Sequence, residues 1–255
     1  VQASAYNRRI TPLTPVEISG AARGNALMKT KYSTAGTAGR GTLNNCGNGY
    51  TPWGTYLTCE ENWAGYFTSH DAENGEPKLP RELKRYGVVA GKNGRYGWEK
   101  AAGGADEYIR FDASTKGASA AEDYRNEPNQ FGWMVEIDPF KPEAKPVKRT
   151  HLGRFGHEGV VFAPAVEGKP VVCYSGDDSR FEYIYKFVSS RKIQPGKGAA
   201  DMESNMRILD EGTLYVAKFN AGAATGDNLH PWLPQGAAAR DFRRLLNEVQ
   251  MLWHA

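Results

Sequence analysis

The fold is decided by residues 157–188, which read HEGVVFAPAVEGKPVVCYSGDDSRFEYIYKFV. Three short runs rich in valine, tyrosine and phenylalanine lie in or beside this stretch, at Gly159–Ala163, Val171–Ser175 and Glu182–Val188, with glycine, proline and aspartate between them. Such runs are typical of short strands joined by turns. A fourth run follows at Thr213–Asn220. The segment therefore predicts an antiparallel meander of four strands, the content of one propeller blade.

The same strand signals continue toward the N-terminus. Runs at Trp133–Asp138 and Glu107–Asp112 predict two further strands. Thr42–Cys46 and Thr55–Glu60 predict a hairpin around a turn at Gly47–Gly54. The fold class is therefore all-β, with propeller-like antiparallel meanders.

Other parts of the chain carry weaker patterns. We expect one short strand near Ala26–Lys31, and a long surface excursion over 68–106 with a helical turn at Pro80–Tyr86. Ala237–Ala255 differs, because its apolar residues follow helical spacing. We predict a propeller-like region over 1–236 and an amphipathic helix over 237–255 that packs on it.

Composition excludes several classes of protein. The formal net charge of +3 is too small to indicate a nucleic-acid partner, and no basic run is interleaved with aromatic residues. No apolar stretch approaches the roughly 18 residues of a membrane span, and the start, VQASAYNRRI, is not of the secretory-leader type. Phosphate-binding P-loop, GxSxG and HExxH motifs are missing from the sequence.

Acidic residues gather at the ends of the expected strands. Glu60 and Glu61 end one strand, Glu158 precedes another, and Asp177 and Asp178 follow a third. Acids beside glycines at strand ends are what a cation site on a β-scaffold needs. Acids at such positions are also common turn formers. Both interpretations stay open at this point.

The three cysteines, Cys46, Cys59 and Cys173, differ in their surroundings. Cys173 stands in the apolar run VVCY and is expected to be buried, whereas Cys46 stands among asparagine and glycine, unlike a core thiol. A disulfide between Cys46 and Cys59 across the hairpin is a geometric alternative. Such a bond would leave no thiolate at Cys46.

Four segments carry a resemblance to a known family: GTLNNCGNGYTPWGTYLTCEENWAGYF, GWMVEIDPF, LGRFGHEGVVFAP and YSGDDSRFEYIYKFV. They resemble the PhoX-type alkaline phosphatases, secreted bacterial enzymes, over roughly residues 1–220. The resemblance implies a β-propeller with iron(III) and calcium ions at the centre of one face. It also implies hydrolysis of small phosphate monoesters in the periplasm or outside the cell, after twin-arginine export.

The resemblance also implies roles for individual residues. Cys46 of the NNC motif is similar to a thiolate ligand of iron, and Glu60, Glu61 and Glu158 are similar to carboxylate ligands of the metal cluster on which catalysis depends. Asp177 of the GDD motif is a further candidate ligand. The division of these acids between iron and calcium stays open.

The chain also departs from the family. Members carry sequence before Val1 and after Asn220 that completes the propeller, so we expect a partial-length member. Ligands on the family's later blades would then be missing. The alternative function is a non-catalytic, propeller-like module with at most one structural calcium site.

Overall fold

The computed structural model describes residues 3–196, 198–219 and 229–230. The described part is mostly β, and none of its sheets closes into a barrel. Its strands are β1 (Pro15–Ser19), β2 (Ala38–Arg40), β3 (Asn45–Tyr50), β4 (Tyr56–Glu60), β5 (Thr68–Ser69), β6 (Ala72–Glu73), β7 (Glu76–Pro77), β8 (Val89–Ala90), β9 (Met134–Ile137), β10 (Val147–Arg149), β11 (His157–Phe162), β12 (Pro170–Asp177), β13 (Ile184–Lys192), β14 (Gly212–Val216), β15 (Lys218–Phe219) and β16 (Leu229–His230).

The helices among the described residues are short. Two are α-helices, α1 (Arg81–Lys84) and α2 (Ala199–Asn205). The others are 3₁₀ turns: η1 (Ala26–Met28), η2 (Trp63–Tyr66), η3 (Trp98–Lys100), η4 (Ile109–Phe111), η5 (Glu127–Gln130), η6 (Thr150–Leu152) and η7 (Ile208–Asp210). No helix within the described ranges is both long and apolar enough to cross a bilayer.

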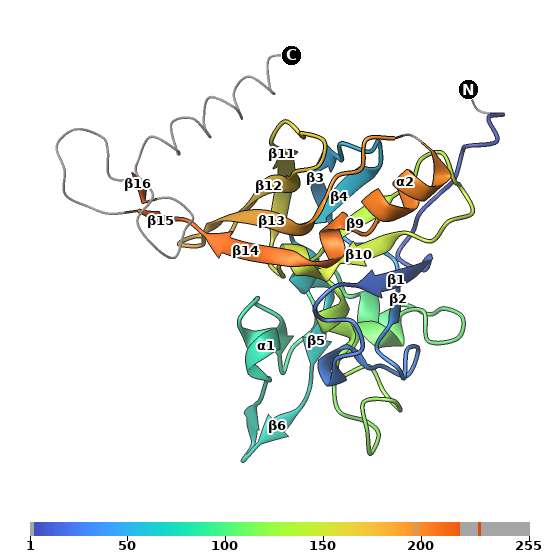
Figure 1. The fold of residues 1–255 in the computed structure, drawn as a ribbon. Coiled ribbons are helices and arrows are strands. Elements are labelled where there is room, and N and C mark those ends of the chain that lie inside the picture. The colour runs from blue at the N-terminus through green and yellow to red at the C-terminus, as the bar shows by residue number, and fades with distance from the viewer. Residues whose placement is uncertain (1–2, 197, 220–228, 231–255) are drawn as a thin grey trace.

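Two larger sheets form the upper tier of the molecule (Figure 1). One has six strands in the order β2-β1-β10-β9-β4-β3, in which β1 and β10 are parallel and the other neighbours are antiparallel. The other has the order β11-β12-β13-β14 and is antiparallel throughout. This sheet confirms the predicted four-strand meander.

The main core lies between these two sheets. Leu57 and Cys59 of β4 contribute side chains from the first sheet, and Val160 and Phe187 contribute from the second. Side chains two apart on a strand share a face, so the apolar alternation at 57 and 59 directs that face of β4 into the core. The hairpin between β3 and β4 is closed by Thr51–Thr55, where Thr51 N–H donates to Thr55 O at 2.9 Å.

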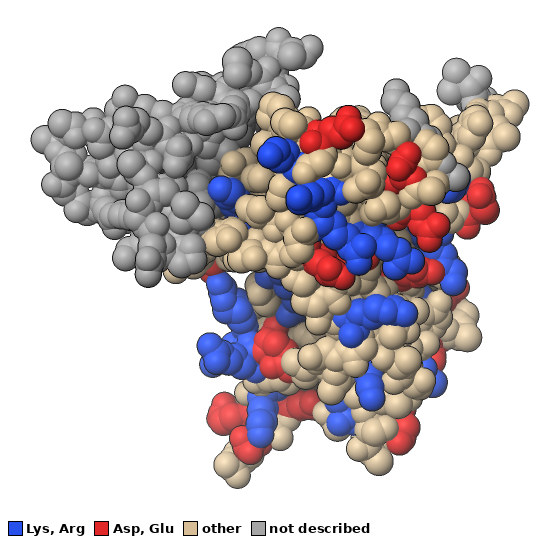
Figure 2. Space-filling model, viewed as in Figure 1, with Lys and Arg blue, Asp and Glu red and all other residues tan. Residues whose placement is uncertain are grey.

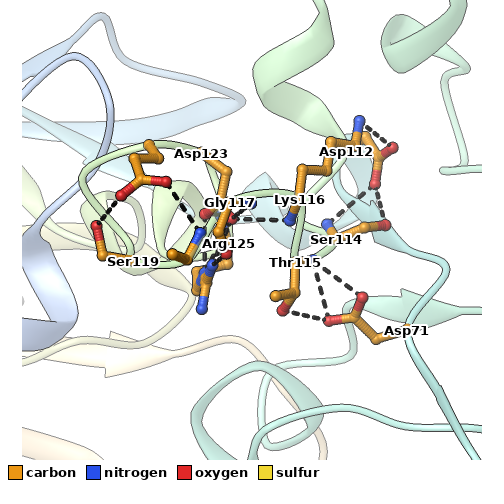
Figure 3. A network of polar contacts seen from close by, with 11 residues as sticks. Asp71, Asp112, Ser114, Thr115, Lys116, Gly117, Ser119, Asp123 and Arg125 are labelled. Atoms are coloured by element: carbon orange, nitrogen blue, oxygen red, sulfur yellow. Dashed lines mark hydrogen bonds and ion pairs between the residues drawn. The ribbon is translucent and has the colours of Figure 1, made fainter.

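A second core forms a lower lobe around α1 and β5 (Figure 1). Its aromatic centre includes Trp63, Phe67, Phe111 and Phe131, all nearly inaccessible to solvent. The lobe also holds the polar loop of Figure 3, in which Asp112 pairs with Lys116 at 2.8 Å. The predicted helical turn is confirmed within this lobe as α1.

Two predicted strands are wrong. Ala26–Lys31 contains η1, whose first turn is capped by the Asn25 side chain accepting from Leu27 N–H. Glu107–Asp112 contains η4, because Phe111 packs into the second core and Arg110 turns inward to a buried ion pair with Glu127. Tertiary contacts here outweigh the local strand pattern.

The predicted turn at Gly47–Gly54 is too long. β3 continues through Gly47 and Gly49 to Tyr50, because these glycines serve a close strand contact rather than a turn. The predicted C-terminal helix over 237–255, with the boundary at 236, lies outside the described residues.

Candidate metal centre

Three of the sequence-predicted residues come together where the two large sheets meet. Cys46 lies in β3, Glu61 follows the last residue of β4, and Glu158 is the second residue of β11. The β3–β4 pairing places Glu61 beside the Cys46 segment, since Glu61 N–H donates to Asn44 O at 3.2 Å. The same pairing sets Asn45 opposite Glu60.

Glycines in β3 bring Cys46 toward β11. A Cβ at Gly47 would lie 2.2 Å from Glu158 O, and one at Gly49 would lie 2.5 Å from Val160 O. Only residues without a side chain allow two backbones to approach this closely. The main chain therefore fixes the spacing between Cys46 and Glu158.

The electrostatics of Cys46 indicate that Glu61 and Glu158 lie near its thiol. A hydrogen bond with Glu61 is the main cause that raises the pKa of the Cys46 thiol, and the charges of Glu61 and Glu158 raise it further. Cys46 and Glu158 are exposed and Glu61 is half-buried. Two carboxylates beside a thiol concentrate negative charge that a bound cation would neutralise, and a cation would favour the thiolate.

Glu60 has a different position from its neighbour Glu61. Its side chain is fully buried and forms an ion pair with Lys148 at 2.9 Å. Its other oxygen accepts from the backbone N–H groups of Gly132 and Trp133 at 2.9 and 3.1 Å. Successive side chains of a strand point to opposite faces. The structure therefore does not bring the Glu60 carboxylate to the Cys46 group, and its oxygens are already bound.

Asp177 lies at the border of the group. It ends β12 opposite His157, and a Cβ at Gly156 would lie 3.2 Å from Asp177 Oδ1 and 3.4 Å from Glu61 O. Burial raises the pKa of the half-buried Asp177 carboxyl. Its side chain accepts from Ser179 N–H at 3.1 Å. Asp177 is thus near the Glu61 backbone, while its carboxylate also serves a turn.

His157 has a structural role at the start of β11. It is fully buried, and burial lowers its pKa to about 3. Its Nε2 lies 3.0 Å from Gly153 O and its Nδ1 lies 3.1 Å from Ser175 Oγ. The imidazole therefore contacts Gly153, which precedes β11, and Ser175 of β12, and the adjacent Glu158 is exposed.

Arg154 connects the segment before β11 to the lower lobe. The guanidinium lies over the rings of Trp63 and Tyr86, at 4.5 and 4.6 Å from their centroids, and burial lowers its pKa to about 10. It donates to three backbone carbonyls, those of Phe131, Glu82 and Pro128. The sequence alone does not distinguish this arginine from a surface cation.

Lys148 is the structural residue that sequence reasoning missed. It lies in β10, donates to Glu60 and to Gln130 O, and contacts the Phe131 ring with its ammonium 3.7 Å from the centroid. Burial lowers its pKa and the Glu60 charge opposes that change. No local signal marks this lysine, because its partner lies 88 residues away in the sequence.

The cysteines are free thiols: Cys46 is exposed, and Cys59 and Cys173 are buried. The disulfide alternative is therefore not formed. Among the residues that the structure describes, no three His, Cys, Asp or Glu side chains already stand in a metal-binding arrangement. The donor set at Cys46, Glu61 and Glu158 fits a hard or borderline cation in its chemistry, and the three side chains are exposed or half-buried.

Comparison with known proteins shows the family of the chain. The family model described as alkaline phosphatase PhoX matches residues 1–249. The chain belongs to this family. The solved structure of Pseudomonas fluorescens PhoX in complex with vanadate, a transition state analogue, is similar to the chain at 46% identity with a TM-score of 0.73. The match covers 89% of this chain and 35% of that PhoX chain. A comparison with curated proteins gave no match.

Proposed function

We propose that this chain carries part of the metal centre of a PhoX-type alkaline phosphatase, which hydrolyses phosphate monoesters and releases inorganic phosphate. The observation that carries the proposal is that Glu61 and Glu158 lie near the Cys46 thiol, where the β3 and β11 backbones contact each other. The chain spans 35% of its solved PhoX relative, and the phosphatase activity is part of what we propose.

Cys46, Glu61 and Glu158 are the residues that would hold metal, with Asp177 beside them as a further candidate. Iron(III) suits the thiolate and carboxylates together, and calcium suits the carboxylate oxygens. Bound metal would supply positive charge that stabilises the phosphate oxygens and the leaving oxygen. Glu60, the fourth carboxylate of the sequence prediction, is better assigned a structural role in its pair with Lys148.

The chain's own residues prepare this position. Gly47 lets the β3 backbone contact β11, so Cys46 and Glu158 face the same solvent region. The Glu60–Lys148 pair fixes the end of β4 and thereby the start of the Glu61 segment. We further propose that the β11–β14 sheet is one blade of a propeller and that the protein acts on small phosphorylated substrates in the periplasm or outside the cell after twin-arginine export.

Figure 2 shows how charged side chains are distributed on one face of the molecule. On the face drawn there, basic and acidic side chains are interspersed rather than gathered in one basic stripe. A nucleic-acid partner normally requires such a stripe.

The adjacent glutamates provide a matched test. We expect Glu61→Gln, Cys46→Ala and Glu158→Gln each to abolish iron and calcium loading and p-nitrophenyl phosphate turnover with little loss of stability. Glu60→Gln should instead lower the free energy of unfolding, because it leaves Lys148 buried without a charged partner. Metal analysis, turnover and urea unfolding of the four variants measure these effects.

Full metal content and normal turnover in Glu61→Gln or Cys46→Ala would refute the assignment. A wild-type chain that is colourless, lacks turnover and gains thermal stability from calcium alone would favour the non-catalytic module.

A further inference from the structure

Phe181 is the most exposed large apolar side chain among the described residues, with 98% of its surface accessible. Its backbone φ is +66°, in the left-handed region that a bulky residue rarely adopts. Both features are unfavourable for an isolated phenylalanine. Backbone strain of this kind is concentrated at functional positions.

The loop that carries Phe181 is anchored at both arms. Asp177 N–H donates to Tyr183 O at 3.1 Å, closing the turn between β12 and β13, and Glu182 N–H donates to Ser179 O at 3.2 Å. The Glu182 carboxylate forms an ion pair with Arg85 of the lower lobe at 2.6 Å. The tip is therefore held in place while the Phe181 ring projects into solvent.

The anchored loop adjoins the candidate metal centre. Asp178, the first residue after Asp177, is bonded to the residue that precedes β11. Its N–H donates to Gly156 O at 3.1 Å. Asp177 Oδ1 and Glu61 O both lie close to Gly156. Phe181 is four residues from Asp177, so their Cα atoms are at most about 14 Å apart. The Phe181 loop therefore borders the candidate metal centre on its Asp177 side.

We propose that Phe181 determines specificity by packing against an aromatic ring in the leaving group of a phosphate monoester. The inference rests on the proposed function and names a substrate class for it. An exposed phenyl ring on an anchored loop is suited to contact another ring, because offset or edge-on contact adds to the burial of apolar surface. Phe181 contacts the organic group and leaves the phosphate to the metal-binding residues.

The test compares two esters and two non-hydrolysable analogues on the holoprotein. In Phe181→Ala, the ratio of kcat/KM for phenyl phosphate to that for glycerol 2-phosphate should fall by about 2- to 10-fold, through KM for the aryl ester. Phe181→Trp should retain the wild-type ratio and Phe181→Leu should not. Phe140→Ala is the matched control, because Phe140 is also largely exposed, at 69%, but lies after β9.

Binding gives a readout that needs no turnover. Calorimetry should show that Phe181→Ala weakens phenylphosphonate relative to methylphosphonate by the same factor. An unchanged ratio in Phe181→Ala, or wild-type behaviour of Phe181→Leu, would overturn the proposal. Wild-type protein that hydrolyses neither ester would refute the proposed function, and the phosphonate ratio would still decide the role of Phe181.

Discussion

Gly47→Ala tests whether the main chain sets the spacing of the metal centre. The new Cβ would lie 2.2 Å from Glu158 O, about 1.2 Å short of ordinary van der Waals contact, and 3.1 Å from Glu158 C. These are backbone atoms, so no side-chain rotation relieves the contact. β3 and β11 must move apart by roughly 1 Å, and overpacking of this kind costs about 1–3 kcal/mol.

The same displacement acts on the ligands, because Cys46 precedes Gly47 and the clashing carbonyl belongs to Glu158 itself. Metal sites tolerate deviations of only about 0.2 Å in ligand distance. We therefore expect metal affinity to fall by about 10- to 100-fold, the range seen when groups that orient ligands are changed.

The assay pairs urea unfolding with metal titration. Gly159→Ala is the control, since it follows Glu158 directly and its Cβ would meet only Asn48 O at 4.0 Å. That variant should bind metal and unfold like the wild type. A Gly47→Ala protein with wild-type stability and wild-type metal affinity would refute the argument that the glycine contact controls ligand spacing.

Three further substitutions have defined expectations. Lys148→Met should cost about 3–5 kcal/mol in urea unfolding, because it leaves the buried Glu60 charge without its cation, and adding Glu60→Gln should recover part of the loss. Lys31 pairs with Asp106 at 2.7 Å and lowers its pKa; Lys31→Met should cost about 0.2–1 kcal/mol at pH 7, and the loss should shrink in unfolding measured at acid pH, as the pH falls through the lowered pKa of Asp106 and its carboxylate is protonated. Phe181→Gly should raise the unfolding free energy by up to about 1 kcal/mol, since glycine accepts a φ of +66° without strain; a lower melting temperature would contradict this.

The sequence predicted the meander well because its strands interact with sequence neighbours. β11 to β14 pair in chain order, so each strand signal has its partner in the next run. Glu107–Asp112 failed for the opposite reason. The conformation there depends on Arg110 reaching Glu127 and on Phe111 joining a core built from distant segments. Such contacts leave no local periodicity.

The candidate site was predictable in its residue types but not in its geometry. Strand alternation indicates that Glu60 and Glu61 face opposite sides. Deciding which one is buried requires Lys148, which reaches Glu60 from another strand. The role of Gly47 was likewise hidden, because a glycine in a strand-like segment resembles a turn residue until the opposing backbone is known.

The neighbouring glutamates give β4 an unusual sensitivity to length. Removing one residue within the strand would place Glu61 beside Lys148 and turn Glu60 to the opposite face, into the position that Cys59 occupies in the core. Lys148 would still have a carboxylate beside it after such a slip. Leu57 and Cys59, however, would leave the core at the same time. Homologous chains can therefore vary in the loops around this strand, whereas insertions and deletions inside it should be eliminated by selection.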